Sequence, residues 1–214
     1  MGFYSFEGRA PVVAPSSFVH PEATLIGDVE VGEGCYIGPG ARLRGDWGRI
    51  SIGPGCNIQE NCVFHVKPDE AVILGPSCHI GHGAILHGPR LGYHVVVGMG
   101  AVIMDEAVLE DECCIAAGAL VSSKVLVPSR KLVVGNPGKI VGEIHNQLYQ
   151  FMTWGTALYQ ELPASCHDSM REVSREYVFA EGKRDPGVTA TGSRERLAVV
   201  AKGLMKSGRV VLKF

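Results

Sequence analysis

Histidines crowd one short stretch of this sequence. Residues 77–88 read SCHIGHGAILHG and contain His79, His82 and His87, three of the eight histidines in a chain of 214 residues. Imidazole nitrogens bind zinc at about 2.0–2.1 Å, and a catalytic zinc site has three protein ligands and one open position. The stretch therefore has two interpretations: three ligands of one metal, or three residues with separate structural roles. The backbone that carries them decides between the two.

An apolar residue at every sixth position indicates what that backbone is. The residue two positions earlier is usually small, and glycine often follows the apolar one. Neither the period of 2 of a strand nor the period of 3.6 of a helix produces this pattern. It is typical of a solenoid of hexapeptide turns, in which three hexads form a triangular coil of about 18 residues and the apolar residue points inward. The repeated positions are Val19, Leu25, Val31, Ile37, Leu43, Ile52, Ile58, Phe64, Leu74, Ile80, Leu86, Leu91, Val97, Ile103, Leu109, Ile115, Val121, Val127 and Val133.

The repeat predicts how the chain is organised. We expect a mainly β protein with a parallel β-helix over residues 9–141. Helical spacing of apolar residues after the repeat predicts an amphipathic helix over 142–162, with Gly155 packed close to the solenoid, and a second helical segment around 166–179. The helical region is thus expected over 142–181. The remaining residues, 182–214, form a tail that begins as a polar Gly/Pro linker.

Five of the seven cysteines occupy the small-residue position of the repeat. They are expected to be buried space-filling thiols rather than nucleophiles or ligands. The other two, Cys114 and Cys166, fall outside that position and have no assigned role. The five are Cys35, Cys56, Cys62, Cys78 and Cys113.

Composition and charge limit the possible partners. The chain has 20 Lys and Arg against 22 Asp and Glu, a formal net charge of −2, so no global basic field favours nucleic acid. No apolar run approaches the roughly 20 residues that span a bilayer, so we expect no membrane partner. The start, MGFYSFEGRAP, lacks the features of a signal peptide. The expectation is a soluble cytoplasmic protein.

The coil places two histidines in one column. His65 follows Phe64 and His87 follows Leu86, so both stand directly after an inward residue. Their separation is one coil plus a four-residue insertion in the loop VKPDEAV, and residues one coil apart stack at about 4.8 Å. We therefore predict that His65 and His87 stack on one face, as two ligands of a metal would. His82 stands two residues after Ile80, away from that pair.

His82 reaches such a pair most easily from another copy of the chain. If three solenoids pack as a symmetric homotrimer, His82 of one copy meets His65 and His87 of the next and completes a three-histidine site. The polar residues Arg44, Asp46, Gln59 and Glu60 lie on the neighbouring coils. We expect two compatible roles for them: an Arg44–Asp46 ion pair at the subunit interface, and a network that orients a metal-bound water or binds a substrate carboxylate or carbonyl. Of the remaining histidines, His20, His79 and His94 are interpreted as ordinary structural residues.

Several strings resemble a known family. LRGDWGRI, GCNIQENCVFH, HIGHGAILHG, VGMGAVIMDEA and VGNPGKI resemble the gamma-class carbonic anhydrase-like hexapeptide-repeat family over about residues 9–142. PVVAPSSFVHPEATLIGDV and WGTALYQELPASC are similar to its PaaY/CaiE subgroup, whose PaaY-type members act as thioesterases in phenylacetate degradation. The resemblance implies a left-handed parallel β-helix and a homotrimer with metal sites between subunits.

The same resemblance implies roles for single residues. His65, His82 and His87 match the three metal ligands, for Zn²⁺ with Fe²⁺ or Co²⁺ as alternatives. The other matches are Arg44 and Asp46 with an active-site pair, Gln59 with a glutamine that orients the metal's water or the substrate, and Glu60 with a position where the family has Asp. The implied function is a metal-dependent acyl-CoA thioesterase, in which the metal lowers the pKa of its water toward about 7 for attack on the thioester.

Three other functions stay open at this point. A carbonic anhydrase would use the same site on CO₂ or bicarbonate, but the acidic proton-shuttle loop of efficient members is replaced here by the short VKPDEAV, where Asp69 or Glu70 could substitute in part. An acyl-CoA-dependent acyltransferase would need a histidine away from the three, with His79 and His94 as candidates. A non-catalytic assembly protein would use the metal only to hold a trimer together.

Overall fold

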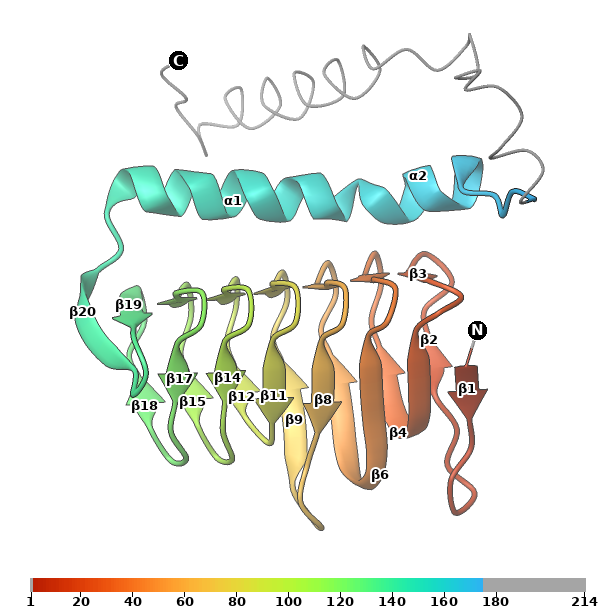
Figure 1. The fold of residues 1–214 in the computed structure, drawn as a ribbon, viewed down its shortest axis with the longest axis horizontal. Helices are drawn as coiled ribbons and strands as arrows, with labels where there is room; N and C mark the ends of the chain where they lie inside the picture. The colour runs from red at the N-terminus through yellow and green to blue at the C-terminus, as the bar shows by residue number, and fades with distance from the viewer. Residues whose placement is uncertain (1, 175–214) are drawn as a thin grey trace, which may run out of the picture.

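The repeat folds into a solenoid of stacked parallel strands. The computed structural model describes residues 2–174, and its coils run along the long axis of Figure 1. Each coil contributes strands to three faces, and equivalent strands of successive coils pair in parallel register. The prediction of a mainly β, parallel solenoid is confirmed.

Two of the faces are continuous around a bent edge. The strand β6 (Arg42–Ile52) pairs with β8 through its first residues and with β9 through its last ones, so residues 44–48 turn the corner between the faces. The first face holds β1 (Gly2–Tyr4), the start of β4 (Thr24–Val31), β8 (Val63–His65), β11 (Ile85–His87), β14 (Val102–Ile103) and β17 (Leu120–Val121). The second holds β2 (Val12–Val13), the end of β4, β9 (Ala71–Leu74), β12 (Arg90–Leu91), β15 (Val108–Leu109) and β18 (Leu126–Val127).

The third face carries the helices. Its strands are β3 (Phe18–Val19), β5 (Tyr36–Ile37), β7 (Asn57–Ile58), β10 (His79–Ile80), β13 (Val96–Val97), β16 (Cys114–Ile115), β19 (Lys131–Val134) and β20 (Lys139–Glu143), the last antiparallel to β19. The helices α1 (Asn146–Gln160) and α2 (Leu162–Ser169) run back along this face (Figure 1). Met152 and Ile144 are buried beside Cys114, which fixes α1 on the solenoid.

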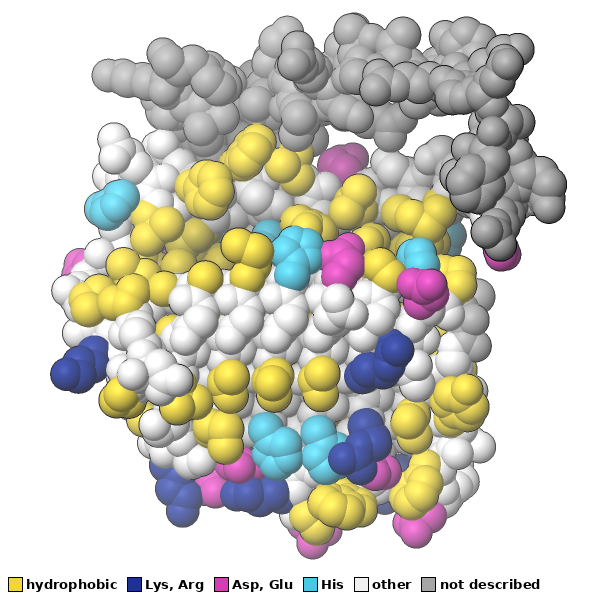
Figure 2. Space-filling model, viewed as in Figure 1, with side chains coloured by type: hydrophobic (Ala, Val, Ile, Leu, Met, Phe, Trp, Pro, Cys, Tyr) yellow, Lys and Arg dark blue, Asp and Glu magenta, His cyan; other side chains and the backbone are white. Residues whose placement is uncertain are grey.

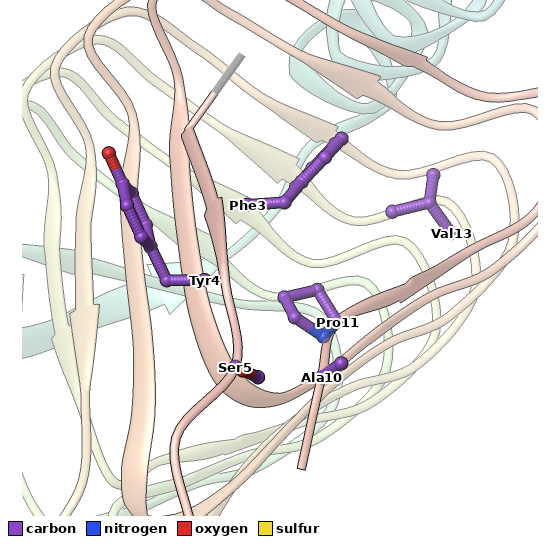
Figure 3. Close-up of a pocket in the computed structure, with 6 residues that line it drawn as sticks. All are labelled: Phe3, Tyr4, Ser5, Ala10, Pro11 and Val13. Atoms are coloured by element: carbon purple, nitrogen blue, oxygen red, sulfur yellow. The ribbon is translucent and has the colours of Figure 1, made fainter. Parts of the chain in front are cut away.

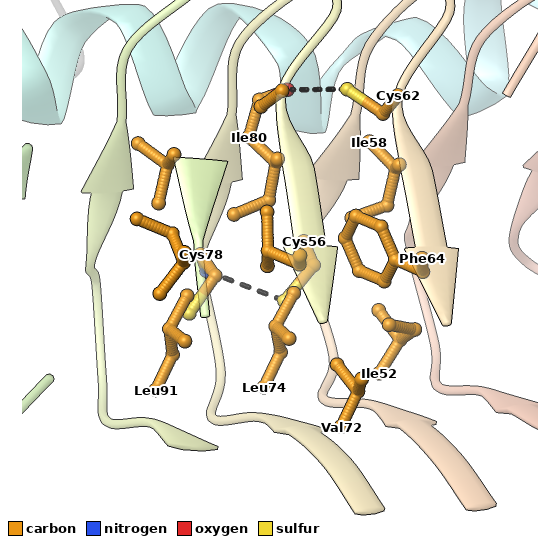
Figure 4. Close-up of a cluster of buried hydrophobic side chains, with 14 of the residues drawn as sticks. Ile52, Cys56, Ile58, Cys62, Phe64, Val72, Leu74, Cys78, Ile80 and Leu91 are labelled. Carbon is orange, nitrogen blue, oxygen red and sulfur yellow. Dashed lines mark hydrogen bonds between the residues drawn. The ribbon is translucent and has the colours of Figure 1, made fainter. Parts of the chain in front are cut away.

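The core is the inside of the triangular coil. Every one of the repeated apolar positions is buried, and in-register stacking forms continuous columns such as Leu43, Phe64 and Leu86. Removing this apolar surface from water stabilises the fold by roughly 25 cal/mol per Å². Figure 4 shows part of the core, with Cys56 and Cys62 filling spaces between the aliphatic side chains. The five cysteines predicted to be structural are buried and free, as are Cys114 and Cys166.

One corner requires glycine for steric reasons. A Cβ at Gly45 would lie 2.4 Å from the backbone oxygen of Asp28 on the preceding coil. Two coils can approach this closely only where the side chain is a hydrogen atom. The tight contact holds the turn that presents Arg44 and Asp46.

The C-terminal segment differs in detail from the predicted helices. Residues 139–143 form β20, so the helical region begins at Asn146 rather than at 142. The first helix ends at Gln160 because Pro163, at the start of α2, cannot donate the next helical hydrogen bond. The second helix ends at Ser169, and residues 170–174 are not helical. The continuation of the helical region to 181 and the tail 182–214 lie outside the described residues.

Two further features concern the N-terminus and membranes. The predicted solenoid begins at residue 9, but β1 adds Gly2–Tyr4 in parallel to Thr24–Ile26; this strand carries no complete hexad, so the repeat could not reveal it. Neither helix in residues 2–174 is long and apolar enough to cross a membrane.

Candidate metal centre

His65 and His87 form a pair on the first face. They are register partners on β8 and β11, and His65 Nδ1 lies 3.2 Å from His87 Nε2. Both rings leave the same face because each follows an inward residue, Phe64 or Leu86, on a strand whose side chains alternate. Figure 2 shows two adjacent histidine side chains over these strands, with basic and acidic groups beside them. The predicted stacking is confirmed.

Each histidine ring contacts a carboxylate through the nitrogen that does not face the other ring. Asp46 Oδ1 lies 3.0 Å from His65 Nε2, and Asp105 Oδ1 lies 2.6 Å from His87 Nδ1. Both carboxylates are largely buried, with 11% and 10% of their side chains exposed. Asp46 also accepts a hydrogen bond from Arg44 Nη1 at 2.5 Å, so the predicted Arg44–Asp46 ion pair is present.

The charges of this cluster follow from its contacts. Burial alone would raise the pKa of Asp46, but hydrogen bonds from Arg44 and His65 outweigh it and lower that pKa. The pKa of Asp105 is lowered in the same way, against burial, by His87 and Lys67. Burial lowers the pKa of His65, so its ring is neutral at neutral pH. The carboxylates are therefore charged, and each accepts a hydrogen bond from its histidine.

This arrangement fits a metal cation. Because a carboxylate only accepts, the hydrogen bonds to Asp46 and Asp105 place protons at His65 Nε2 and His87 Nδ1. When neither ring carries a second proton, the two nitrogens that face each other at 3.2 Å both present lone pairs. Two nitrogens on one tetrahedral zinc stand about 3.3 Å apart at ordinary bond lengths, so a cation between them relieves the repulsion. Within residues 2–174 of a single chain, no group of three or more His, Cys, Asp or Glu could hold a metal.

His82 lies on the same coil as His87 but apart from the histidine pair. It occupies the turn between β10 and β11, and its Nδ1 forms a very short contact with Glu60. Glu60 also accepts a hydrogen bond from the Tyr36 hydroxyl at 3.3 Å. The His82 side chain is 46% exposed, with its Nδ1 held by a carboxylate. The structure thus groups His82 with Glu60, apart from the His65–His87 pair.

Gln59 takes part in a different cluster. Its Nε2 lies 2.9 Å from Asn57 Oδ1 and 2.8 Å from His79 Nε2, beneath α1. The ring of Tyr159 packs edge-on against His79 at 5.2 Å, and burial lowers the pKa of His79 to about 4. A Cβ at Gly155 would lie 3.8 Å from the same ring, in agreement with the predicted close packing. His79 is therefore the partner of Gln59 in this structure.

Two residues at the pair were missed from the sequence. Asp105 stands 18 residues after His87, one coil further along, and that spacing was the available signal. Lys67 reaches Asp105 Oδ2 at 3.4 Å. Beside the pair, the exposed Trp47 ring lies 5.2 Å from the His65 ring and 5.7 Å from the Arg44 guanidinium.

One pocket lies away from the histidine pair. A cavity of about 300 Å³ opens at the N-terminal end between Phe3, Tyr4, Ser5, Ala10, Pro11 and Val13 (Figure 3). Its lining is mostly apolar and includes none of the candidate site residues.

The chain matches known proteins over most of its length. Residues 10–45 match the family model described as bacterial transferase hexapeptide (six repeats). The carnitine operon protein CaiE of Escherichia coli K12 is 46% identical over 172 residues, which cover 80% of this chain and 88% of that protein. A hexapeptide transferase family protein from Anaplasma phagocytophilum is 34% identical with a TM-score of 0.74, over 77% of this chain and 97% of that one. A putative acetyltransferase from Bacillus cereus is 31% identical with a TM-score of 0.76, over 78% and 96%.

The coiled fold, the repeat and these matches define the class of protein. It is a hexapeptide-repeat protein, and its solenoid is the left-handed β-helix of that class. More narrowly, the chain belongs to the CaiE-like family of gamma-class carbonic anhydrase-like hexapeptide-repeat proteins. The resemblance drawn from the sequence motifs is confirmed at this level.

Proposed function

We propose that this protein is a metal-dependent hydrolase of acyl-CoA thioesters, of the PaaY type, with Zn²⁺ as its metal and Fe²⁺ or Co²⁺ as alternatives. One observation carries the proposal: His65, His82 and His87 each have one ring nitrogen against a carboxylate. Metal-binding histidines are held in this way, because the carboxylate fixes the tautomer and the ring orientation. When bound, Zn²⁺ supplies Lewis-acid activation of water or of a carbonyl oxygen.

The residues of the chain prepare the site for that chemistry. Asp46 and Asp105 accept hydrogen bonds from His65 Nε2 and His87 Nδ1, so His65 Nδ1 and His87 Nε2 stay available to a metal. The Arg44 guanidinium balances the charge of Asp46. The Trp47 indole packs beside the His65 ring, with the two ring centres 5.2 Å apart.

The site is completed by a second copy of the chain in this proposal. An apolar column of register partners on the first face, Val63, Ile85, Val102 and Leu120, runs beside the histidine pair. Val63 and Ile85 are 40% and 42% exposed, which supports burial of this face against another solenoid. A homotrimer closed through this face would bring His82 of one copy to the His65–His87 pair of the next.

The test compares metal content and thioester hydrolysis in matched variants. His87→Ala is expected to lose stoichiometric zinc and the release of CoA from an arylacetyl-CoA, because one of three ligands is gone. His20→Ala is the control, because His20 follows β3 on the third face, where its side chain accepts from Glu22 N at 3.2 Å and packs edge-on against Phe18; it should keep both properties. Undiminished hydrolysis by metal-free His87→Ala would sink the mechanism. Stopped-flow CO₂ hydration by the same metal-loaded protein separates a carbonic anhydrase from a thioesterase.

Acyl transfer is the second candidate, because relatives with solved structures are described as transferases. It requires a reactive imidazole away from the histidine pair. His94 is only 3% exposed, and His79 lies beneath Tyr159, so α1 would have to move before either could react. Metal-independent acyl transfer to an added acceptor would favour this candidate. If chelation dissolves the trimer and the metal-loaded protein hydrolyses no ester or thioester, a non-catalytic assembly role is favoured instead.

A further inference from the structure

We propose that Asp105 is a positioning residue of the metal centre, which fixes the His87 ring so that its Nε2 faces His65. The inference rests on the proposed function, because it concerns the same centre. It adds a residue from the next coil, whose side chain contacts the ring rather than the metal. The bond between Asp105 Oδ1 and His87 Nδ1, at 2.6 Å, is the contact that carries it.

The surroundings of Asp105 are built around this contact. The Asp105 side chain is 10% exposed, in the turn that follows β14. A Cβ at Gly88 would lie 3.1 Å from Asp105 Oδ1, so the glycine after His87 leaves room for the carboxylate. The backbone also ties the two coils together there, because Glu106 N donates to Gly88 O at 3.0 Å.

The second oxygen of Asp105 is engaged as well. Lys67 Nζ lies 3.4 Å from Oδ2, and the same ammonium lies 3.9 Å from Glu106 Oε1. With an imidazole on one oxygen and an ammonium on the other, the carboxylate cannot rotate without losing both partners. An ion pair between Asp105 and Lys67 alone would not explain why the other carboxylate oxygen contacts the His87 ring. Asp46 makes the matching contact on His65, so the pair is bracketed from both sides.

The positioning role of Asp105 can be measured without an assay of enzymatic activity. The variants are Asp105→Ala, which removes the acceptor, and Asp105→Asn, which keeps an oxygen acceptor without the charge. Zinc affinity is measured by competition with a chromophoric chelator, and the protonated nitrogen of His87 is read from ¹⁵N chemical shifts of the metal-free protein. Glu106→Gln is the matched control, because Glu106 contacts Lys67 and Lys124 and is 40% exposed.

We expect Asp105→Ala to bind zinc about 10- to 100-fold more weakly, the usual cost of removing an outer-shell partner. Its His87 ring should lose the uniform Nδ1–H tautomer, whereas Asp105→Asn keeps the tautomer and loses less affinity. Glu106→Gln should match the wild type in both. Wild-type zinc affinity together with an unchanged tautomer in Asp105→Ala would overturn the inference.

Failure of the proposed function gives a different result. If the wild-type protein binds no zinc, the function proposed above is wrong, and the tautomer of His87 still decides whether Asp105 positions that ring. If Asp105→Ala does not fold, as judged by far-UV circular dichroism, Asp105→Asn and Glu106→Gln carry the comparison. Equal zinc affinities of Asp105→Asn and the wild type, with a mixed tautomer in both, would then overturn the inference.

Discussion

Glu112 anchors helix α1 to the solenoid, and its removal should weaken that docking by a measurable amount. Glu112 accepts hydrogen bonds from Arg130 Nη1 at 2.8 Å and from the Tyr149 hydroxyl at 2.9 Å, and Tyr149 lies on α1. The Arg130 guanidinium also lies 4.8 Å from the centre of the Tyr149 ring. Hydrogen bonds to a charged group contribute about 1.5–3 kcal/mol. Because the Glu112 side chain is 22% exposed, we take the lower part of that range.

The expected loss in Glu112→Ala is therefore about 2 kcal/mol of docking free energy, or roughly 30-fold faster hydrogen exchange of the α1 amides. Tyr149→Phe removes only the hydroxyl and should produce a smaller change. Glu143→Ala is the control, because the Glu143–Lys131 ion pair at 2.8 Å involves an exposed carboxylate and such pairs contribute little. Exchange of α1 that is the same in Glu112→Ala as in the wild type would refute the reasoning.

The anchor also has a defined pH dependence. Burial alone would raise the pKa of Glu112, but hydrogen bonds from Arg130 and Tyr149 lower it below the ordinary 4.5. The undocked state then binds the proton more tightly, so the contribution is complete above pH 4.5 and is lost as the pH falls through the lower pKa of the docked state. After correction for intrinsic exchange rates, acid should loosen α1 more in the wild type than in Glu112→Gln; the effect that remains in the variant comes from His79, whose pKa burial beneath α1 lowers to about 4.

Two further predictions concern stability. Phe64 is fully buried between Leu43 and Leu86, so Phe64→Ala should cost about 3–5 kcal/mol and Phe64→Leu, which matches the column, less than about 1.5 kcal/mol. The denaturation midpoint should therefore be lower for Phe64→Ala than for Phe64→Leu, and equal midpoints would contradict close packing of the column. Gly45→Ala would place a Cβ 2.4 Å from a backbone oxygen and should cost about 1–3 kcal/mol. A melting temperature equal to that of the wild type would show that this corner can open.

The sequence predicted those parts of the site that depend only on the repeat. Parallel pairing makes the coil period a spatial rule, so the stacking of His65 and His87 followed from counting, and counting 18 residues beyond His87 would also have found Asp105. The contact of Gln59 with His79 depends on how α1 covers the third face. No repeat specifies the docking of a helix, so that cluster could not be predicted.

The number of residues between equivalent positions on two coils does not set the distance between the side chains at those positions. Asp46, His65, His87 and Asp105 are separated by 19, 22 and 18 residues, yet each contacts the next. Backbone pairing sets the distance from one coil to its neighbour at about 4.8 Å, and the additional residues leave the ladder as a loop at 67–70. Residues inserted in this loop lengthen the loop beside the histidine pair and leave the separation of the two histidine rings unchanged. This loop is thus the place where new side chains can be brought to the centre without altering the geometry of its ligands.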